Sequence, residues 1–177
     1  MLAAIRAESA VERSRLLIEA EELLAREAWC LDMRQWQPWL DLYLEDAVFW
    51  APAWRNDDEM TDDVKREISL FYFDSRAGLA DRVWRIQTGR AAALTPMPRT
   101  THLVSNALLA EGESDNALTV YSAFTCNIFS LRDRSQHSYF GRYEHDLVRR
   151  DGAWRIARKK IIVMNDYIPA VVEFFCI

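Results

Sequence analysis

His145 stands directly beside Asp146 in the stretch GRYEHDLVRRDGAWRIARKK, which runs from Gly141 to Lys160. A histidine and a carboxylate within hydrogen-bond distance of each other can act as an acid–base pair. The flanking residues are typical of β-strands, however, and successive side chains of a strand point to opposite faces of its sheet. His145 and Asp146 are therefore predicted to face apart and not to form a catalytic dyad with each other.

The turn between the two runs predicts how their residues pair. Asp151–Gly152 indicates a two-residue hairpin loop. That loop sets a register in which His145 faces Arg158 and Glu144 faces Lys159. Each cross-strand pair of opposite charge contributes about 0.2–1 kcal/mol to the register. His145 beside Arg158 suits either a wet pocket or a hydrogen bond within the sheet, and we favour the structural role because one residue makes no catalytic constellation.

The histidines and cysteines give little support to a metal site. His137 and His145 are eight residues apart on one expected strand. At about 3.3 Å per residue they are roughly 26 Å apart and cannot share an ion. An iron site with two histidines and one carboxylate would need His102 to approach one of them. The cysteines are widely spaced, at Cys30, Cys126 and Cys176. We therefore predict no metal ligands in this chain, and reduced thiols in a cytoplasmic protein.

His102, in the segment PRTTHLVSN, is the stronger acid–base candidate. On a strand it shares one side with Thr100, Val104 and Asn106. A carboxylate such as Asp46, which follows the second expected helix, would complete an acid–base pair if the fold brought the two side chains together. We favour the alternative, a histidine that is hydrogen-bonded in an internal cavity and has no catalytic role.

The size and charge of the chain restrict the class of protein. Its 177 residues suffice for one sizeable core, so we expect a single domain over residues 1–177. The net charge of −5 disfavours nucleic acid as a partner. The apolar runs are too short for a transmembrane helix, and the acidic residues near the N-terminus argue against a signal peptide.

The expected elements are helices first and strands afterwards. A capping box at Ser9–Glu12 predicts the start of a helix whose apolar residues, Trp29 among them, recur at helical spacing up to a break at Asp32. Two further helices are expected at 36–44 and 74–88, and two strands at 47–52 and 68–73. Four strands separated by turns follow from Arg99 onward. This order predicts an α+β fold in which one curved, mostly antiparallel sheet wraps around packed helices.

Several segments resemble one protein family in their order and spacing: WLDLYLEDAVFWAPAW, EISLFYFDSRAGLADRVWRIQTGRAA, RTTHLVSN, SYFGRYEHDL and KKIIVMNDYI. The chain resembles the small (β) subunit of aromatic-ring-hydroxylating dioxygenases, and within it the benzoate/anthranilate group. The resemblance extends from about Glu22 to Ile177, and residues 1–20 look like a variable N-terminal helical extension. It implies a cone-like fold of the nuclear-transport-factor type.

The resemblance also implies a division of labour between two kinds of chain. In the family, a large (α) subunit carries a Rieske iron–sulfur centre and a mononuclear iron, and electrons arrive from NADH through a reductase. The small subunit holds together an assembly of typically three large and three small chains. This chain would then be a structural subunit without catalytic residues or cofactor, in contact with the large subunit and, through trimer contacts, with itself. A second hypothesis is an autonomous dehydratase or isomerase on the same cone fold, using His102 with Asp46.

The C-terminal segment is a candidate for subunit contacts. After Asp166 the sequence reads YIPAVVEFFCI, and large apolar side chains left exposed there would promote aggregation. These residues either dock on the helices of their own chain or contact another subunit. Because the resembled family is oligomeric, we favour the subunit contact. The candidate interface residues are Tyr167, Phe174, Phe175 and Ile177.

Overall fold

Helices precede a long run of strands, in the order that the sequence predicts. The structure is a computed structural model and describes residues 2–90, 94–110, 114, 116–165, 167–168 and 172–177, with side chains from residue 10 onward. Its elements are α1 (Leu2–Asp32), α2 (Trp36–Leu40), β1 (Tyr43–Pro52), β2 (Ser69–Phe73), α3 (Arg76–Gln87), β3 (Arg99–Leu109), β4 (Ala117–Ser130), β5 (Ser135–Arg150), β6 (Ala153–Val163) and a 3₁₀ turn at Phe174–Cys176.

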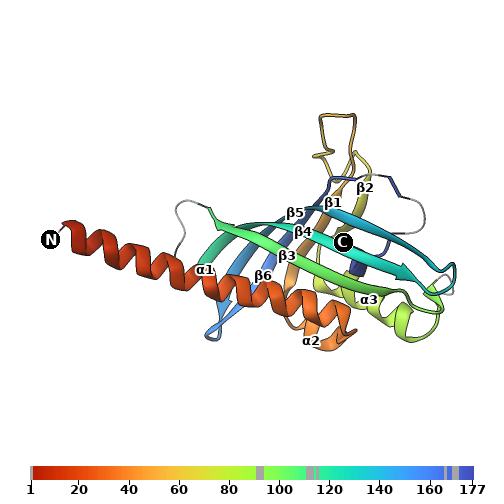
Figure 1. Cartoon of the computed structure of the whole chain (residues 1–177), viewed down its shortest axis with the longest axis horizontal. Coiled ribbons are helices and arrows are strands. Elements are labelled where there is room, and N and C mark those ends of the chain that lie inside the picture. Colours follow the sequence, from red (N-terminus) through yellow and green to blue (C-terminus); the bar gives the residue numbers. More distant parts are fainter. Residues whose placement is uncertain (1, 91–93, 111–113, 115, 166, 169–171) are drawn as a thin grey trace.

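The strands of the described residues form one mixed sheet in the order β2-β1-β6-β5-β4-β3. β1 runs parallel to β6, and all the other neighbours are antiparallel. The strands curve behind α1, whose N-terminal end projects beyond the sheet (Figure 1). The buried apolar residues of helices and strands form a common core. The predicted α+β class, with a curved and mostly antiparallel sheet around helices, is confirmed.

The helices differ from the prediction at two boundaries and in the exposure of one residue. α1 is continuous through Ser9–Glu12, so the capping box does not begin it, because the preceding residues are themselves good helix formers. α2 ends at Leu40, and Tyr43 already belongs to β1. Trp29 is 60% exposed, since its neighbours on α1 take the positions that face the core.

The hairpin of β5 and β6 has the predicted turn but not the predicted register along its whole length. Asp151–Gly152 forms the turn, with positive φ angles of 52° and 78°. The register then shifts between Asp146 and Leu147 because β6 carries one extra residue, Ala157, in a β-bulge. Each later pair moves by one position, so His145 faces Lys159 and not Arg158.

The C-terminal side chains pack inside their own chain. Phe174 and Ile177 have no exposed surface, and Phe175 is 2% exposed. The Phe174 ring stacks on Trp39 of α2 with ring centroids 5.0 Å apart, and Trp36 contacts both phenylalanines edge-on. The subunit contact that we favoured for these three residues therefore loses its basis, because the helices of the same chain already cover them.

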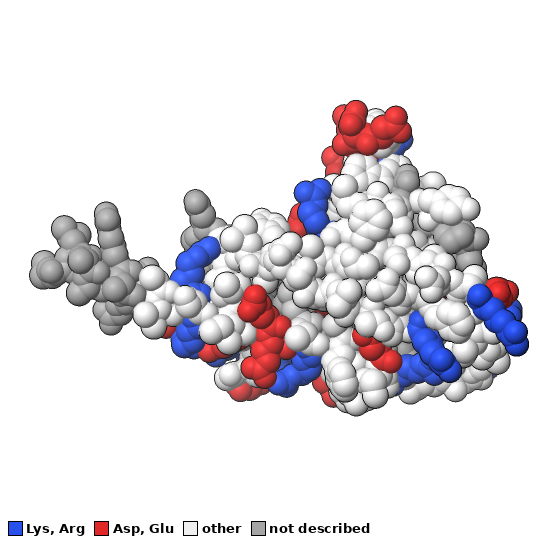
Figure 2. Space-filling model, viewed as in Figure 1, with Lys and Arg blue, Asp and Glu red and all other residues white. Residues whose placement is uncertain are grey.

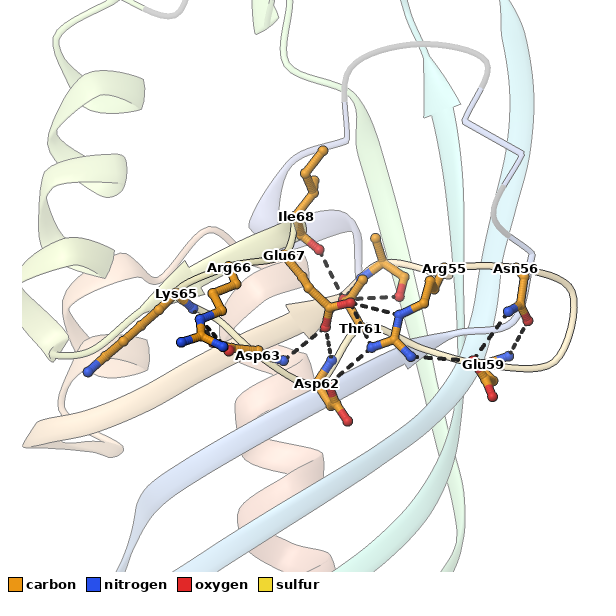
Figure 3. Close-up of polar contacts among 11 residues, drawn as sticks. Arg55, Asn56, Glu59, Thr61, Asp62, Asp63, Lys65, Arg66, Glu67 and Ile68 are labelled. Carbon is orange, nitrogen blue, oxygen red and sulfur yellow. Dashed lines mark hydrogen bonds and ion pairs between the residues drawn. The ribbon is translucent and has the colours of Figure 1, made fainter.

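The connection between β1 and β2 is an acidic loop organised around one arginine (Figure 3). The Arg55 guanidinium contacts the carboxylates of Glu59, Asp62 and Glu67. Glu67 also accepts the backbone N–H groups of Asp62 and Asp63. Those two backbone bonds, and then Arg55, lower the pKa of Glu67 to about 2. Figure 2 shows the acidic side chains gathered at the tip of this loop.

Candidate functional site

The main polar site of the protein is a cluster inside the cone, centred on Glu27 of α1. Glu27 is 2% exposed, although carboxylates rarely lie in a core without partners. Lys159 Nζ of β6 lies 2.9 Å from Glu27 Oε1, and His145 Nε2 of β5 lies 3.3 Å from Glu27 Oε2. The Tyr43 hydroxyl of β1 donates a further hydrogen bond to Glu27 Oε1. One carboxylate thus connects α1 to three strands.

The cluster balances its own charge. Burial alone would raise the pKa of Glu27, but the Lys159 ammonium and the hydrogen bonds from His145 and Tyr43 outweigh it and hold that pKa well below its ordinary value. Burial lowers the pKa of His145 more than Glu27 raises it, so the imidazole is neutral at pH 7 and its Nε2–H donates to Glu27. Burial, and then Glu27, raise the pKa of Tyr43. The site is therefore one buried ion pair with two neutral hydrogen-bond donors.

Aromatic rings surround the buried ammonium. Lys159 Nζ lies 4.1 Å from the centroid of the Tyr143 ring and 5.9 Å from that of Phe49, within the range of cation–π attraction. Among the described residues, the Tyr143 hydroxyl and His145 Nδ1 are buried without a hydrogen-bond partner. These two atoms give the interior one donor and two acceptors for a small polar molecule such as water.

His102 forms a carboxylate pair, but with a different residue from the one predicted. Its Nδ1 lies 2.7 Å from Asp32 Oδ1, at the end of α1. Asp46 is exposed on β1 and does not complete this pair. Asp32 also accepts the His102 backbone N–H at 2.8 Å and the Thr100 hydroxyl at 2.9 Å. Burial would raise the pKa of Asp32, but these hydrogen bonds lower it overall. Because β3 lies at the edge of the sheet, Asp32 fastens that edge strand to α1.

A third carboxylate of α1 holds the hairpin of β5 and β6. Glu19 Oε2 accepts Trp154 Nε1 at 2.8 Å and Arg149 at 2.7 Å. The Trp154 hydrogen bond is the main cause of a lowered pKa at Glu19. Glu19, Glu27 and Asp32 therefore fix successive parts of α1 to the sheet. This arrangement holds the helix in place against the sheet.

The thiols and the acidic residues do not assemble a metal centre in the described part of the chain. No group of three or more histidine, cysteine or acidic side chains there is placed to hold an ion. Burial raises the pKa of the Cys126 thiol, and it raises that of Cys176 to about 12. None of the helices in that part is both long and apolar enough to cross a membrane.

Sequence reasoning missed the two most buried charges. Glu27 follows Leu23 and precedes Leu31 by four residues each, so its position lies on the apolar stripe of α1. A lone acid on such a stripe is the available signal for a buried partner. Lys159 gives no comparable signal, because the β-bulge decides which face of the sheet it occupies. From the sequence, Asp32 is expected only to end the helix. A side chain at the C-terminal end of a helix can also bind a neighbouring strand, as Asp32 does here.

A strongly curved sheet, wrapped around a helix that is pinned by internal carboxylates, defines a cone-shaped α+β protein of the nuclear-transport-factor type. Residues 26–170 match the family described as "Ring hydroxylating beta subunit". The chain belongs to this family.

Relatives and a solved structure agree with that assignment. The chain is 38% identical over 157 residues to "Benzoate 1,2-dioxygenase subunit beta" of Acinetobacter baylyi. This match covers 89% of this chain and 91% of the relative. It is 38% identical to "Toluate 1,2-dioxygenase subunit beta" of Pseudomonas putida, and this match covers 87% of this chain and 93% of the relative. The crystal structure of the benzoate 1,2-dioxygenase beta subunit from Burkholderia mallei superposes with a TM-score of 0.75 at 32% identity, covering 91% of this chain and 97% of that one.

Proposed function

We propose that this chain is the non-catalytic small subunit in the terminal oxygenase of a Rieske-type dioxygenase that hydroxylates an aromatic carboxylate, within aromatic compound catabolism. The observation that carries the proposal is the family match over residues 26–170. Relatives named for benzoate, toluate, 2-halobenzoate and anthranilate dioxygenases, at 30–38% identity, support a benzoate-like substrate class.

The partner that this role requires is a large subunit that carries the metal centres. A Rieske cluster takes two cysteine thiolates and two histidines. Among the residues that the structure describes, no group of three or more histidine, cysteine or acidic side chains is placed to hold an ion. We therefore assign the iron–sulfur cluster and the mononuclear iron to the large chain, with NADH as the electron source through a reductase.

The expected assembly has three large and three small chains and works in the cytoplasm, where NADH is available. Tyr167 is 78% exposed and remains a candidate for a contact between subunits. We further propose that residues 1–177 act as one domain within that assembly, with a chain-specific extension at the start of α1.

One observation favours the second candidate function, a dehydratase or isomerase. His102 and Asp32 have the geometry of a carboxylate-oriented histidine. His102 Nε2 is buried and has no hydrogen-bond partner among the described residues. Asp32 also accepts hydrogen bonds from the His102 backbone N–H and from Thr100, and these bonds indicate a structural role that holds β3 against α1. We therefore rank the subunit role first.

The test is reconstitution with the large chain encoded beside this one. The large chain would be produced with and without this chain, and NADH- and benzoate-dependent oxygen consumption would be measured with the cognate reductase. The proposal predicts turnover only from the co-produced complex and none from this chain alone. Full turnover by the large chain by itself would contradict the proposal. The same holds if this chain alone converts a substrate and that activity disappears in His102→Ala.

A further inference from the structure

The outer face of α1 carries an apolar stripe that the rest of the chain leaves uncovered. Val11 is 71% exposed, Ile18 is 64% exposed and Trp29 is 60% exposed, and Ala25 is exposed as well. At 100° per residue, Ile18 lies about 180° around the helix from Glu27. α1 therefore has two apolar faces: the inner one packs on the sheet, and the outer one, the Val11–Trp29 stripe, meets solvent in the single chain.

The spacing along the stripe is that of a helix–helix contact. Val11, Ile18 and Ala25 repeat every seven residues, and the small residues Ser14 and Ala28 follow Val11 and Ala25 by three residues each. These side chains line two shallow hollows on α1. One hollow, of about 500 Å³, lies at Ala10–Glu19. The other, of about 640 Å³, lies between the later half of α1 and β3. Small side chains in such a row let a second helix backbone approach closely.

We propose that the Val11–Trp29 stripe is a docking surface for a second copy of this chain, in which two α1 helices pack antiparallel about a two-fold axis at Ile18. Ile18 then meets Ile18 of the second copy. Val11 faces Ala25 of the second copy, because both lie seven residues from Ile18. A large residue is thus opposed to a small one at each end, which makes the surface complementary to itself as a two-fold contact requires.

The charges along the stripe favour the antiparallel copy. Arg15 and Glu22 lie on the same flank, about 60° and 40° around the helix from Ile18. A two-fold axis perpendicular to the helices brings like flanks together. Arg15 is three residues before the axis and Glu22 is four residues after it, so Arg15 of each copy meets Glu22 of the other. A parallel pair would not place these two opposite charges together.

The position of α1 in the fold leaves room for this contact. The stripe faces directly away from the core, and the N-terminal end of α1 projects beyond the sheet (Figure 1). The projecting end of one copy can therefore lie along the hollow beside β3 of the other, while the two sheets stay on the outer sides. Val11, Ile18 and Ala25 also lie before residue 26, outside the region that matches the family.

Sedimentation of the full chain alone tests the proposal. The wild type should form, in a reversible and concentration-dependent equilibrium, a species of twice the mass of the one that Ile18→Glu forms. Ile18→Glu places two like charges at the axis and should raise the dimer dissociation constant roughly 100-fold. Its circular dichroism and thermal unfolding should stay unchanged because Ile18 is exposed. Ile68→Glu is the matched control, since Ile68 is 79% exposed before β2, and it should leave the dimer intact.

Two further variants examine the geometry. Arg15→Glu and Glu22→Arg should each weaken the dimer, and the double variant should regain it, since the swap restores the pairing between copies. Ile18→Cys should form a cross-linked dimer with an added oxidant, and Ile68→Cys should not. A wild-type chain that stays monomeric at all concentrations overturns the proposal. An Ile18→Glu variant that dimerises normally also overturns it. The same holds if Ile18→Glu loses its binding to the large chain while its dimerisation is unchanged. That binding is measured separately by co-purification, so the assignment as a small subunit can stand or fail independently.

Discussion

Lys159→Met is the substitution that tests the interior cluster most sharply. It removes the ammonium at 2.9 Å from Glu27 and leaves the carboxylate with His145 and Tyr43 as neutral donors. Methionine retains most of the side-chain volume, so the cavity term is small. An uncompensated buried charge costs about 3–5 kcal/mol, and loss of the contact with the Tyr143 ring adds about 0.5–2 kcal/mol. We expect the free energy of unfolding at pH 7 to fall by about 3.5–7 kcal/mol overall.

The pH dependence gives a second signature with a definite sign. In the wild type, the pKa of folded Glu27 lies below its ordinary value of 4.5, so its stabilisation is present above pH 4.5 and is lost as the pH falls. Without Lys159, burial becomes the dominant influence and raises that pKa above the unfolded value. The carboxylate then destabilises the fold at pH 7, and protonation relieves this. The stability gap between wild type and Lys159→Met should narrow from pH 7 towards pH 4.5.

Urea unfolding followed by far-UV circular dichroism measures both effects. The double variant Glu27→Gln with Lys159→Met is the matched control, because the glutamine amide removes the charge and keeps an acceptor for His145 and Tyr43. It should recover at least about 1 kcal/mol relative to Lys159→Met and should lose the pH-dependent gap. A single variant that costs less than about 1 kcal/mol at pH 7, or a gap that does not change with pH, would refute the reasoning about Glu27.

Three other predictions follow from the packing. Phe174→Ala should lower the free energy of unfolding of the single chain by about 3–5 kcal/mol in the same assay, and a loss below about 1 kcal/mol would return this residue to an interface role. His102→Ala should keep the turnover of the assembled oxygenase within about tenfold of the wild type, and a roughly thousandfold loss of turnover in an intact complex would indicate that His102 is catalytic. Asp32→Asn should mainly lower the free energy of unfolding, by about 1–3 kcal/mol. Gly141→Ala should prevent normal folding, because a Cβ there would lie 1.9 Å from the Ile162 carbonyl oxygen, and wild-type expression with an unchanged melting temperature would contradict the register of β5 and β6.

The sequence specified the turn and the fold class but not the register beyond the turn. Asp151–Gly152 has local chemistry that only a few backbone geometries satisfy, so it could be predicted. The β-bulge at Ala157 has no such local signal, because it depends on how the hairpin twists against its neighbours. That one residue decides that Lys159, and not Arg158, meets His145 inside the cone.

The candidate site shows the same limit. His102 was recognisable as a residue that needs a carboxylate, but its partner Asp32 comes from the end of a helix 70 residues away along the chain. Only the packing of α1 against the edge strand β3 selects it over Asp46. The C-terminal phenylalanines were correctly expected to be buried somewhere. These rings could be covered by Trp36 and Trp39 of α2 or by another subunit. Which of the two covers them depends on how the cone closes, and the sequence pattern does not determine that.

The central claim is that this chain serves as a structural subunit beside a metal-bearing large chain. The most direct measurement is the native mass of the co-produced oxygenase, followed by separation of the subunits and iron analysis of each. The account predicts a complex with equal numbers of large and small chains, and all of the iron with the large chain. A small chain that purifies apart from the large one, or that carries about one iron per chain after separation, would contradict it.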